Sequence, residues 1–163
     1  MPPATPSITR RRIGATDEEF LVALYRSTRE SELALVNWDD GQKAAFIQQQ
    51  FDAQHRYYQQ VYPDGSFEVI LAGGQAAGRL YLATEPDDTL IIDVAMLPRF
   101  QNQGIGTALV TEVLADAATR GASVTIHVER NNPALRWYGR LGFRPVEDQG
   151  VYLLLRHPAA QKG

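Results

Sequence analysis

Residues 93–107 read DVAMLPRFQNQGIGT, an apolar run followed by a loop with two glycines. The run from Thr89 to Leu97 is almost wholly apolar, which predicts a strand buried on both faces. Residues 98–103 predict a loop, and the spacing of apolar residues over Gly104–Arg120 predicts a helix. The order of this segment is therefore strand, loop, helix.

The first turn of that helix is a candidate anion site, because its N–H groups have no partner inside the helix. The helix dipole adds to the attraction for a negative charge. Two glycines let a phosphate approach the backbone closely, and a threonine hydroxyl follows them. The predicted ligands are Gln101, Asn102, Gln103, Gly104, Ile105, Gly106 and Thr107. The alternative is a tight turn before a packed helix.

Two common nucleotide-binding loops do not fit this segment. A dinucleotide-binding loop needs a third glycine three residues after Gly106, where Leu109 stands. A Walker loop needs Gly-Lys-Ser/Thr, which the segment lacks. The phosphate of a different ligand is therefore expected here.

Outward from this segment, the hydrophobic pattern and the turn residues predict the other elements. On the N-terminal side these are a strand over 8–15, helices over 16–35 and 41–60, and strands over 66–72 and 76–84. On the C-terminal side they are a strand over 124–129, a short helix over 133–141, and strands over 143–146 and 151–156. This order predicts an α/β protein with a mixed sheet and helices on its faces.

Two motifs resemble the GNAT superfamily of N-acetyltransferases. Gln101-x-x-Gly104-x-Gly106, after an apolar strand and a proline, resembles the loop that binds the acyl-CoA pyrophosphate. Residues 131–143, NNPALRWYGRLGF, resemble the family's later Asn, Ala, Tyr and Gly-Phe pattern. The resemblance is specific over residues 89–146 and only general over residues 8–88.

The resemblance implies a single GNAT-like (acyl-CoA N-acyltransferase) domain over residues 8–157. Its sheet would be mixed and mostly antiparallel, with about seven strands and helices on both faces. Residues 1–7 and 158–163 would be flexible ends.

The implied reaction is direct transfer of an acetyl group from acetyl-CoA to a primary amine of a small molecule or peptide, in a ternary complex. The pantetheine arm would lie between the fourth and fifth strands, beside the backbone of Ala95 and Met96. An N–H at Met96 or Leu97 would stabilise the oxyanion, and Asn131 and Asn132 would complete the cofactor site. The alternatives are a non-catalytic acyl-CoA-binding sensor or interaction module, and a glycine-loop nucleotide binder.

One position departs from the family pattern. The loop begins with Gln101, whereas the family more often has Arg there. Glutamine donates hydrogen bonds but carries no charge, so we expect weaker CoA binding.

Four residues are candidates for proton transfer. The resemblance implies that Tyr138 binds CoA and protonates its leaving thiolate; the alternative is a core tyrosine. Asp93 is a carboxylate in an apolar strand and needs a partner. In many family members an acid near this point accepts the amine proton. A purely structural role for Asp93, bonded to a neighbouring backbone group or arginine, is an equal alternative. His127 and Glu129 lie two residues apart and therefore share one face of their strand, and each is an alternative to Asp93 as the base that accepts the amine proton.

The acceptor site is expected to be lined by Trp38, Phe46, Tyr57 and His127. Aromatic residues at helical spacing are also typical of a core, so this assignment competes with simple packing.

Composition narrows the function classes. The chain has 163 residues, 44% of them hydrophobic, which suits one domain. No run is long and apolar enough to span a membrane, and a net charge of −3 argues against nucleic-acid binding. The chain has no cysteine, and its three histidines lack metal-ligand spacing, so no metal is expected. We expect a cytoplasmic protein; a homodimer is an alternative to a monomer, because dimers are common among such enzymes.

Overall fold

The computed structural model describes residues 6–159. Residues 1–5 and 160–163, which make up most of the two predicted flexible ends, lie outside the described residues. One seven-stranded sheet has the order β1-β2-β3-β4-β5-β7-β6. Its strands are β1 (Ile8–Arg12), β2 (Ser66–Ala72), β3 (Gln75–Thr84), β4 (Asp88–Met96), β5 (Ser123–Glu129), β6 (Arg144–Asp148) and β7 (Tyr152–His157). All neighbours are antiparallel except β4 and β5, so the predicted mixed, mostly antiparallel sheet is confirmed.

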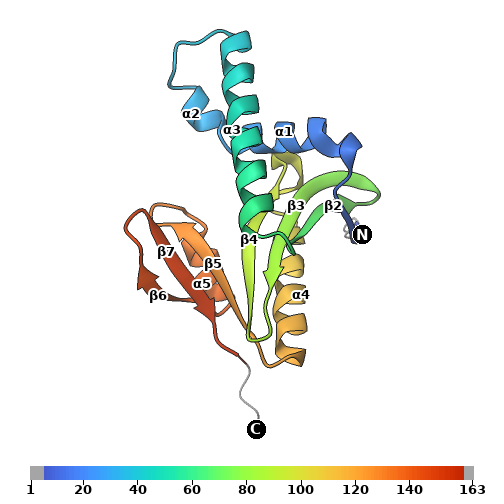
Figure 1. Ribbon diagram of the computed structural model, residues 1–163, viewed down its shortest axis with the longest axis vertical. Helices are drawn as coiled ribbons and strands as arrows, with labels where there is room; N and C mark the ends of the chain where they lie inside the picture. The colour runs from blue at the N-terminus through green and yellow to red at the C-terminus, as the bar shows by residue number, and fades with distance from the viewer. Residues whose placement is uncertain (1–5, 160–163) are drawn as a thin grey trace.

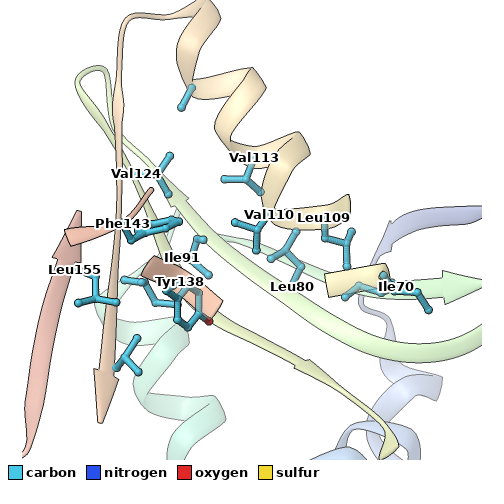
Figure 2. Packing of buried hydrophobic residues seen from close by; sticks show 14 of the residues in the cluster. Ile70, Leu80, Ile91, Leu109, Val110, Val113, Val124, Tyr138, Phe143 and Leu155 are labelled. Carbon is cyan, nitrogen blue, oxygen red and sulfur yellow. The ribbon is translucent and has the colours of Figure 1, made fainter. Parts of the chain in front are cut away.

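Helices cover both faces of this sheet (Figure 1). They are η1 (Ala15–Asp17), α1 (Glu18–Ser27), α2 (Glu30–Leu33), α3 (Asp40–Val61), η2 (Pro98–Phe100), α4 (Ile105–Thr119) and α5 (Leu135–Arg140). The main core lies between the sheet and the helices α4 and α5, and includes Leu80, Ile91, Val110 and Tyr138 (Figure 2). A smaller core joins α1, α2 and α3 on the other face.

The predicted helix over residues 16–35 is interrupted. α1 ends at Ser27, and the short α2 begins only at Glu30. The hydroxyls of Ser27 and Thr28 donate hydrogen bonds to the carbonyls of Leu24 and Tyr25, each at 2.6 Å. Such bonds compete with the helical ladder and end it. The break brings Thr28 to the opening described below.

The prediction that β4 is buried on both faces is wrong for most of its length. Only Thr89 and Ile91 are buried, and the rest of the strand is half-buried. The reason is the pairing with β5, which extends only from Asp88 opposite Ser123 to Ile91 opposite Ile126. Beyond this point the two parallel strands separate, and β4 faces an opening instead of a neighbouring strand.

A buried carboxylate ties β1 to the start of α1. Arg11 donates two hydrogen bonds of 2.8 Å to the carboxylate of Asp17, and the N–H of Gly14 donates a third at 2.7 Å. Asp17 is only 6% exposed. These bonds, the guanidinium's first among them, lower the pKa of Asp17 from 3.8 to about 2.

We predict that this carboxylate makes stability depend on pH. The folded-state pKa of about 2 lies below the usual 3.8, so its contribution is present above pH 4 and is lost as the pH falls toward 2. Asp17→Asn should lower the free energy of unfolding at pH 7 by about 1–3 kcal/mol and flatten the decline between about pH 4 and 2. Urea unfolding across that range measures both effects. Asp64→Asn, in the exposed turn before β2, is the control; an equal effect there would refute the assignment.

Candidate active site

Two cavities meet where β4 and β5 separate. One, here called the tyrosine cavity, has a volume of about 660 Å³ and lies between α1, α3, β4, β5 and β7. The other, here called the loop cavity, has a volume of about 870 Å³ and lies between β4, the loop before α4, and α5. Both volumes suit small-molecule ligands. The two cavities share one wall, formed by Thr28, Val94, Ala95, Asn132 and Tyr138.

The loop cavity contains the predicted anion site. α4 begins after Gly104, whose φ of 79° lies in the left-handed region that favours glycine. The first N–H of the helical ladder is that of Ala108, which donates to the Gly104 carbonyl at 3.0 Å. The N–H groups of residues 105–107 therefore remain available to a ligand. Trp137 Nε1 donates to the Thr107 hydroxyl at 2.9 Å and fixes this side of the cavity.

Several predicted loop ligands have other partners. Gln101 lines the loop cavity, but its Nε2 donates to the Met96 carbonyl at 3.0 Å. Gln103 donates to the Arg99 carbonyl at 2.7 Å and lines neither cavity. The Ile105 side chain is part of the main core, so this residue can offer only its backbone. Asn102 lines the loop cavity, whereas Asn131 lines neither cavity.

The register of β3 and β4 decides which backbone groups face the opening. Leu97 N–H donates to the Ala77 carbonyl at 2.8 Å, so the prediction of Leu97 as an oxyanion donor is wrong. In an antiparallel ladder only alternate residues direct N–H and C=O toward the partner strand. Because Leu97 does so, Ala95 does too, while Val94 and Met96 direct their backbone groups toward β5. Ala95 lines both cavities but does not offer its backbone there.

Asp93, the carboxylate in the apolar strand, has the partner that its position was expected to need. Arg79, which is 4% exposed, donates to Asp93 and also to Gln54 Oε1, the latter at 2.8 Å. Burial lowers the pKa of Arg79, but the attraction of Asp93 and its other polar neighbours outweighs this and leaves the pKa raised. All three residues line the tyrosine cavity. Arg79 was not among the predicted site residues, although an arginine within the apolar strand AAGRLYLA is the same kind of signal as Asp93.

Tyr138 is both a core residue and a wall of the site. Its ring is 6% exposed and packs edge-on against Phe143, with ring centroids 5.6 Å apart (Figure 2). It nevertheless lines both cavities. Burial, reinforced by the charge of Asp93, raises the pKa of Tyr138 well above its usual value of 10. The phenol therefore stays protonated at every ordinary pH.

Two further predicted residues lie in the tyrosine cavity. His127 and Glu129 are exposed on β5 and line it. His127 Nδ1 lies 3.0 Å from Gln149 Oε1 in the connection between β6 and β7. The rival bases are therefore in one cavity with Asp93, and Glu129 takes part in no ion pair within residues 6–159.

Of the three aromatic residues predicted to line the acceptor site, only one lines a cavity. Tyr57 lines the tyrosine cavity. Trp38 and Phe46 line neither cavity; they pack edge-on against each other at 5.3 Å, and Phe46 contacts the smaller core. The upper half of α3 extends beyond the sheet with α2 (Figure 1), so neither cavity supports their substrate role, which stays a prediction.

Two further properties concern metals and membranes. Over residues 6–159, no group of three or more His, Cys, Asp or Glu side chains is placed to hold a metal ion. Among the helices of the described part of the chain, none has the length and the apolar run needed to cross a bilayer.

Comparison with known proteins identifies the family. Residues 17–143 match the acetyltransferase (GNAT) family. Compared by sequence with curated proteins, the chain matches none.

Solved structures of acetyltransferases share the fold. The PaiA N-acetyltransferase of Thermoplasma acidophilum, in complex with coenzyme A, has a TM-score of 0.70 at 18% identity over 93% of this chain and 99% of that one. An acetyltransferase of Thermus thermophilus has a TM-score of 0.66 at 18% identity over 93% and 97%. The N-acetylglutamate synthase of Neisseria gonorrhoeae, with coenzyme A and N-acetyl-glutamate, has 0.62 at 17% over 97% and 36%.

Proposed function

The chain belongs to the acetyltransferase (GNAT) family, and from this we propose that it transfers an acetyl group from acetyl-CoA directly to a primary amine in a ternary complex. The observation that carries the proposal is the shared wall of the two cavities, with Tyr138 in it. Acetyl-CoA would enter the loop cavity and the amine the tyrosine cavity. The thioester and the nucleophile would then meet at this wall without a covalent enzyme intermediate.

The loop cavity fits the polar parts of CoA. The free N–H groups of residues 105–107 and the dipole of α4 suit the pyrophosphate. The N–H and C=O groups of Val94, directed away from β3, would pair with the pantetheine amides in the way a neighbouring strand would. The Met96 N–H would also stabilise the negative charge that develops on the thioester oxygen.

We predict that Gly104→Ala weakens CoA binding at least tenfold, or by about 1.4 kcal/mol. The added methyl group would lie where the pyrophosphate approaches, and it has no protein neighbour within 4 Å. The matched control is Gly121→Ala, because Gly121 at the other end of α4 also has a positive φ and open space around it. Backbone strain is then similar in the two variants. Calorimetry with CoA compares them; equal affinities would refute the loop assignment.

The position of Tyr138 suits a proton donor to the leaving thiolate. A free thiol has a pKa near 8.5, whereas the pKa of Tyr138 is raised above 10. The phenol therefore keeps its proton at neutral pH, and it can pass this proton on as negative charge develops on a sulfur whose own basicity is raised by the same burial. The packed ring fixes the direction of the hydroxyl, so little reorganisation is needed at the moment of transfer.

We predict that Tyr138→Phe lowers kcat at least thirtyfold, since a general acid contributes about 10²- to 10⁴-fold. Core packing and acetyl-CoA affinity should be nearly unchanged, because only the hydroxyl is removed. The wild-type rate should show no decline from this group up to about pH 10, given its raised pKa. Thiol-release kinetics against pH tests this. A Phe variant with nearly normal kcat would reduce Tyr138 to a packing residue.

Of the carboxylates in the tyrosine cavity, we propose Glu129 as the group that accepts the amine proton, directly or through a water molecule. Asp93 is occupied by Arg79, and protonating it would leave a buried guanidinium without its counterion. Glu129 has no such partner within residues 6–159 and stays exposed on β5. Asp93 then acts mainly as the structural partner of Arg79.

We predict that Glu129→Gln lowers kcat/KM most at neutral pH, with the loss shrinking at high pH, where the amine is already free. Asp93→Asn should instead lower the free energy of unfolding by about 1–3 kcal/mol without that pH signature. Rate profiles and urea unfolding of both variants distinguish the roles. The reverse assignment, with Asp93 as the base, follows if only Asp93→Asn shows the recovery at high pH.

The alternative function is a non-catalytic acyl-CoA sensor or interaction module. Such a module would need the loop cavity but no second cavity at the thioester. A thiol-release assay with acetyl-CoA and a broad set of amines separates the two functions: CoA binding without turnover of any amine would favour the sensor.

A further inference from the structure

The tyrosines of this chain are concentrated in one place. Of the seven in the sequence, six line the tyrosine cavity. They are Tyr25, Tyr57, Tyr58, Tyr62, Tyr138 and Tyr152. They come from α1, α3, α5, β7 and the residue after α3, so no single helical repeat explains their gathering. The seventh, Tyr81, packs edge-on behind Tyr58 at 6.1 Å.

The faces of two of these rings already hold cations. The guanidinium of Arg29 lies over the ring of Tyr25 at 5.3 Å, and that of Arg79 lies over Tyr81 at 4.8 Å. Other rings are still accessible from solvent: Tyr57 is 56% exposed and Tyr152 is 45% exposed. Both line the tyrosine cavity but not the loop cavity, so they are not part of the wall that the two cavities share. An aromatic face attracts a positive charge placed over it.

The charges in the cavity favour the same ligand. Its two arginines are both paired, Arg79 with Asp93 and Arg29 with Glu32 at 3.1 Å. Glu129 has no such partner within residues 6–159, so the lining carries an excess of negative charge. No arginine of the cavity is left free, within those residues, to receive a carboxylate of an acceptor. Burial first, and then the charge of Asp93, raises the pKa of Tyr58, so this phenol stays neutral and adds no charge to the lining.

We propose that the acceptor carries a second positive charge besides the amine that is acetylated, and that the rings of Tyr57 and Tyr152 recognise it. This inference rests on the proposed acetyl transfer and names the class of acceptor, a small dication. The reacting amine would lie at the shared wall beside Tyr138. The second cation would lie over the exposed tyrosine faces at the mouth of the cavity, with Glu129 contributing to the field. Amino acids, whose carboxylate would meet that field, are disfavoured.

Three linear acceptors test the proposal, because they share one amine and five methylene groups and differ only at the far end. They are α,ω-diaminopentane, hexylamine and 6-aminohexanoate, which end in an ammonium, a methyl and a carboxylate group. We expect kcat/KM for the diamine to exceed that for hexylamine by about tenfold, as cation–π contacts in a partly desolvated site allow. The aminohexanoate should be the poorest substrate. Equal rates, or a preference for hexylamine or the aminohexanoate, would overturn the inference while leaving acetyl transfer intact.

A pair of double variants tests the recognising residues. Tyr57→Leu with Tyr152→Leu removes both aromatic faces, whereas Tyr57→Phe with Tyr152→Phe keeps them. The ratio of kcat/KM for the diamine to that for hexylamine should fall at least about fivefold in the Leu variant and stay within about twofold in the Phe variant. A change in a base or acid used by both acceptors cannot move this ratio. An unchanged ratio in the Leu variant would refute the role of the rings.

Binding measurements keep the inference testable if no acceptor turns over. Absence of thiol release with all amines would count against the proposed transfer. Calorimetry of the same three compounds with the protein saturated with CoA would still rank them. The diamine binding most tightly would support the dication site, and any other order would contradict it.

Discussion

The short pairing of β4 with β5 is the constraint on which the site depends. Within residues 6–159 these are the only parallel neighbours in the sheet, and they pair over four residues before separating. Each strand then continues with a different neighbour on its far side, β3 for β4 and β7 for β5. The separation leaves N–H and C=O groups of β4 without a partner strand. Buried backbone groups of this kind normally need a hydrogen-bond partner. A ligand with amide groups fits this gap, because it can make the bonds that the missing strand would have made.

The core explains why the opening does not close. α4 and α5 pack against the same face of the sheet, and their side chains join residues of β3, β4, β5 and β7 in one cluster (Figure 2). Tyr138 belongs to that cluster, so the ring that lines both cavities is held by the packing that holds the two halves of the sheet together. Packing and function therefore coincide in this residue, since a rigid ring is what aims a hydroxyl into a cavity.

The loop cavity and the tyrosine cavity differ in the source and sign of their charge. On the loop side, positive potential comes from the backbone of α4 and from Arg140, which also lines the loop cavity. Gln101 instead holds the Met96 carbonyl. On the tyrosine side, Arg79 and Asp93 neutralise each other within the sheet. What remains there is the π-face of the tyrosines and the carboxylate of Glu129. The two cavities thus differ in charge in the way that the proposed anionic cofactor and the proposed cationic acceptor would require.

The sequence by itself determined the elements and the loop. Hydrophobic periodicity and turn residues located the strands and helices, with the first helix as the main error, because hydroxyl side chains at Ser27 and Thr28 broke it. The two glycines and the residues around them marked the candidate anion site, since a helix start after a glycine turn is a local property. Only the tertiary structure decided which polar residues meet. The partner of Asp93 lies on a neighbouring strand, and six tyrosines spread over more than a hundred residues gather in one cavity. These contacts between residues distant in the sequence depend on where β4 and β5 separate, and the local sequence of neither strand determines that point.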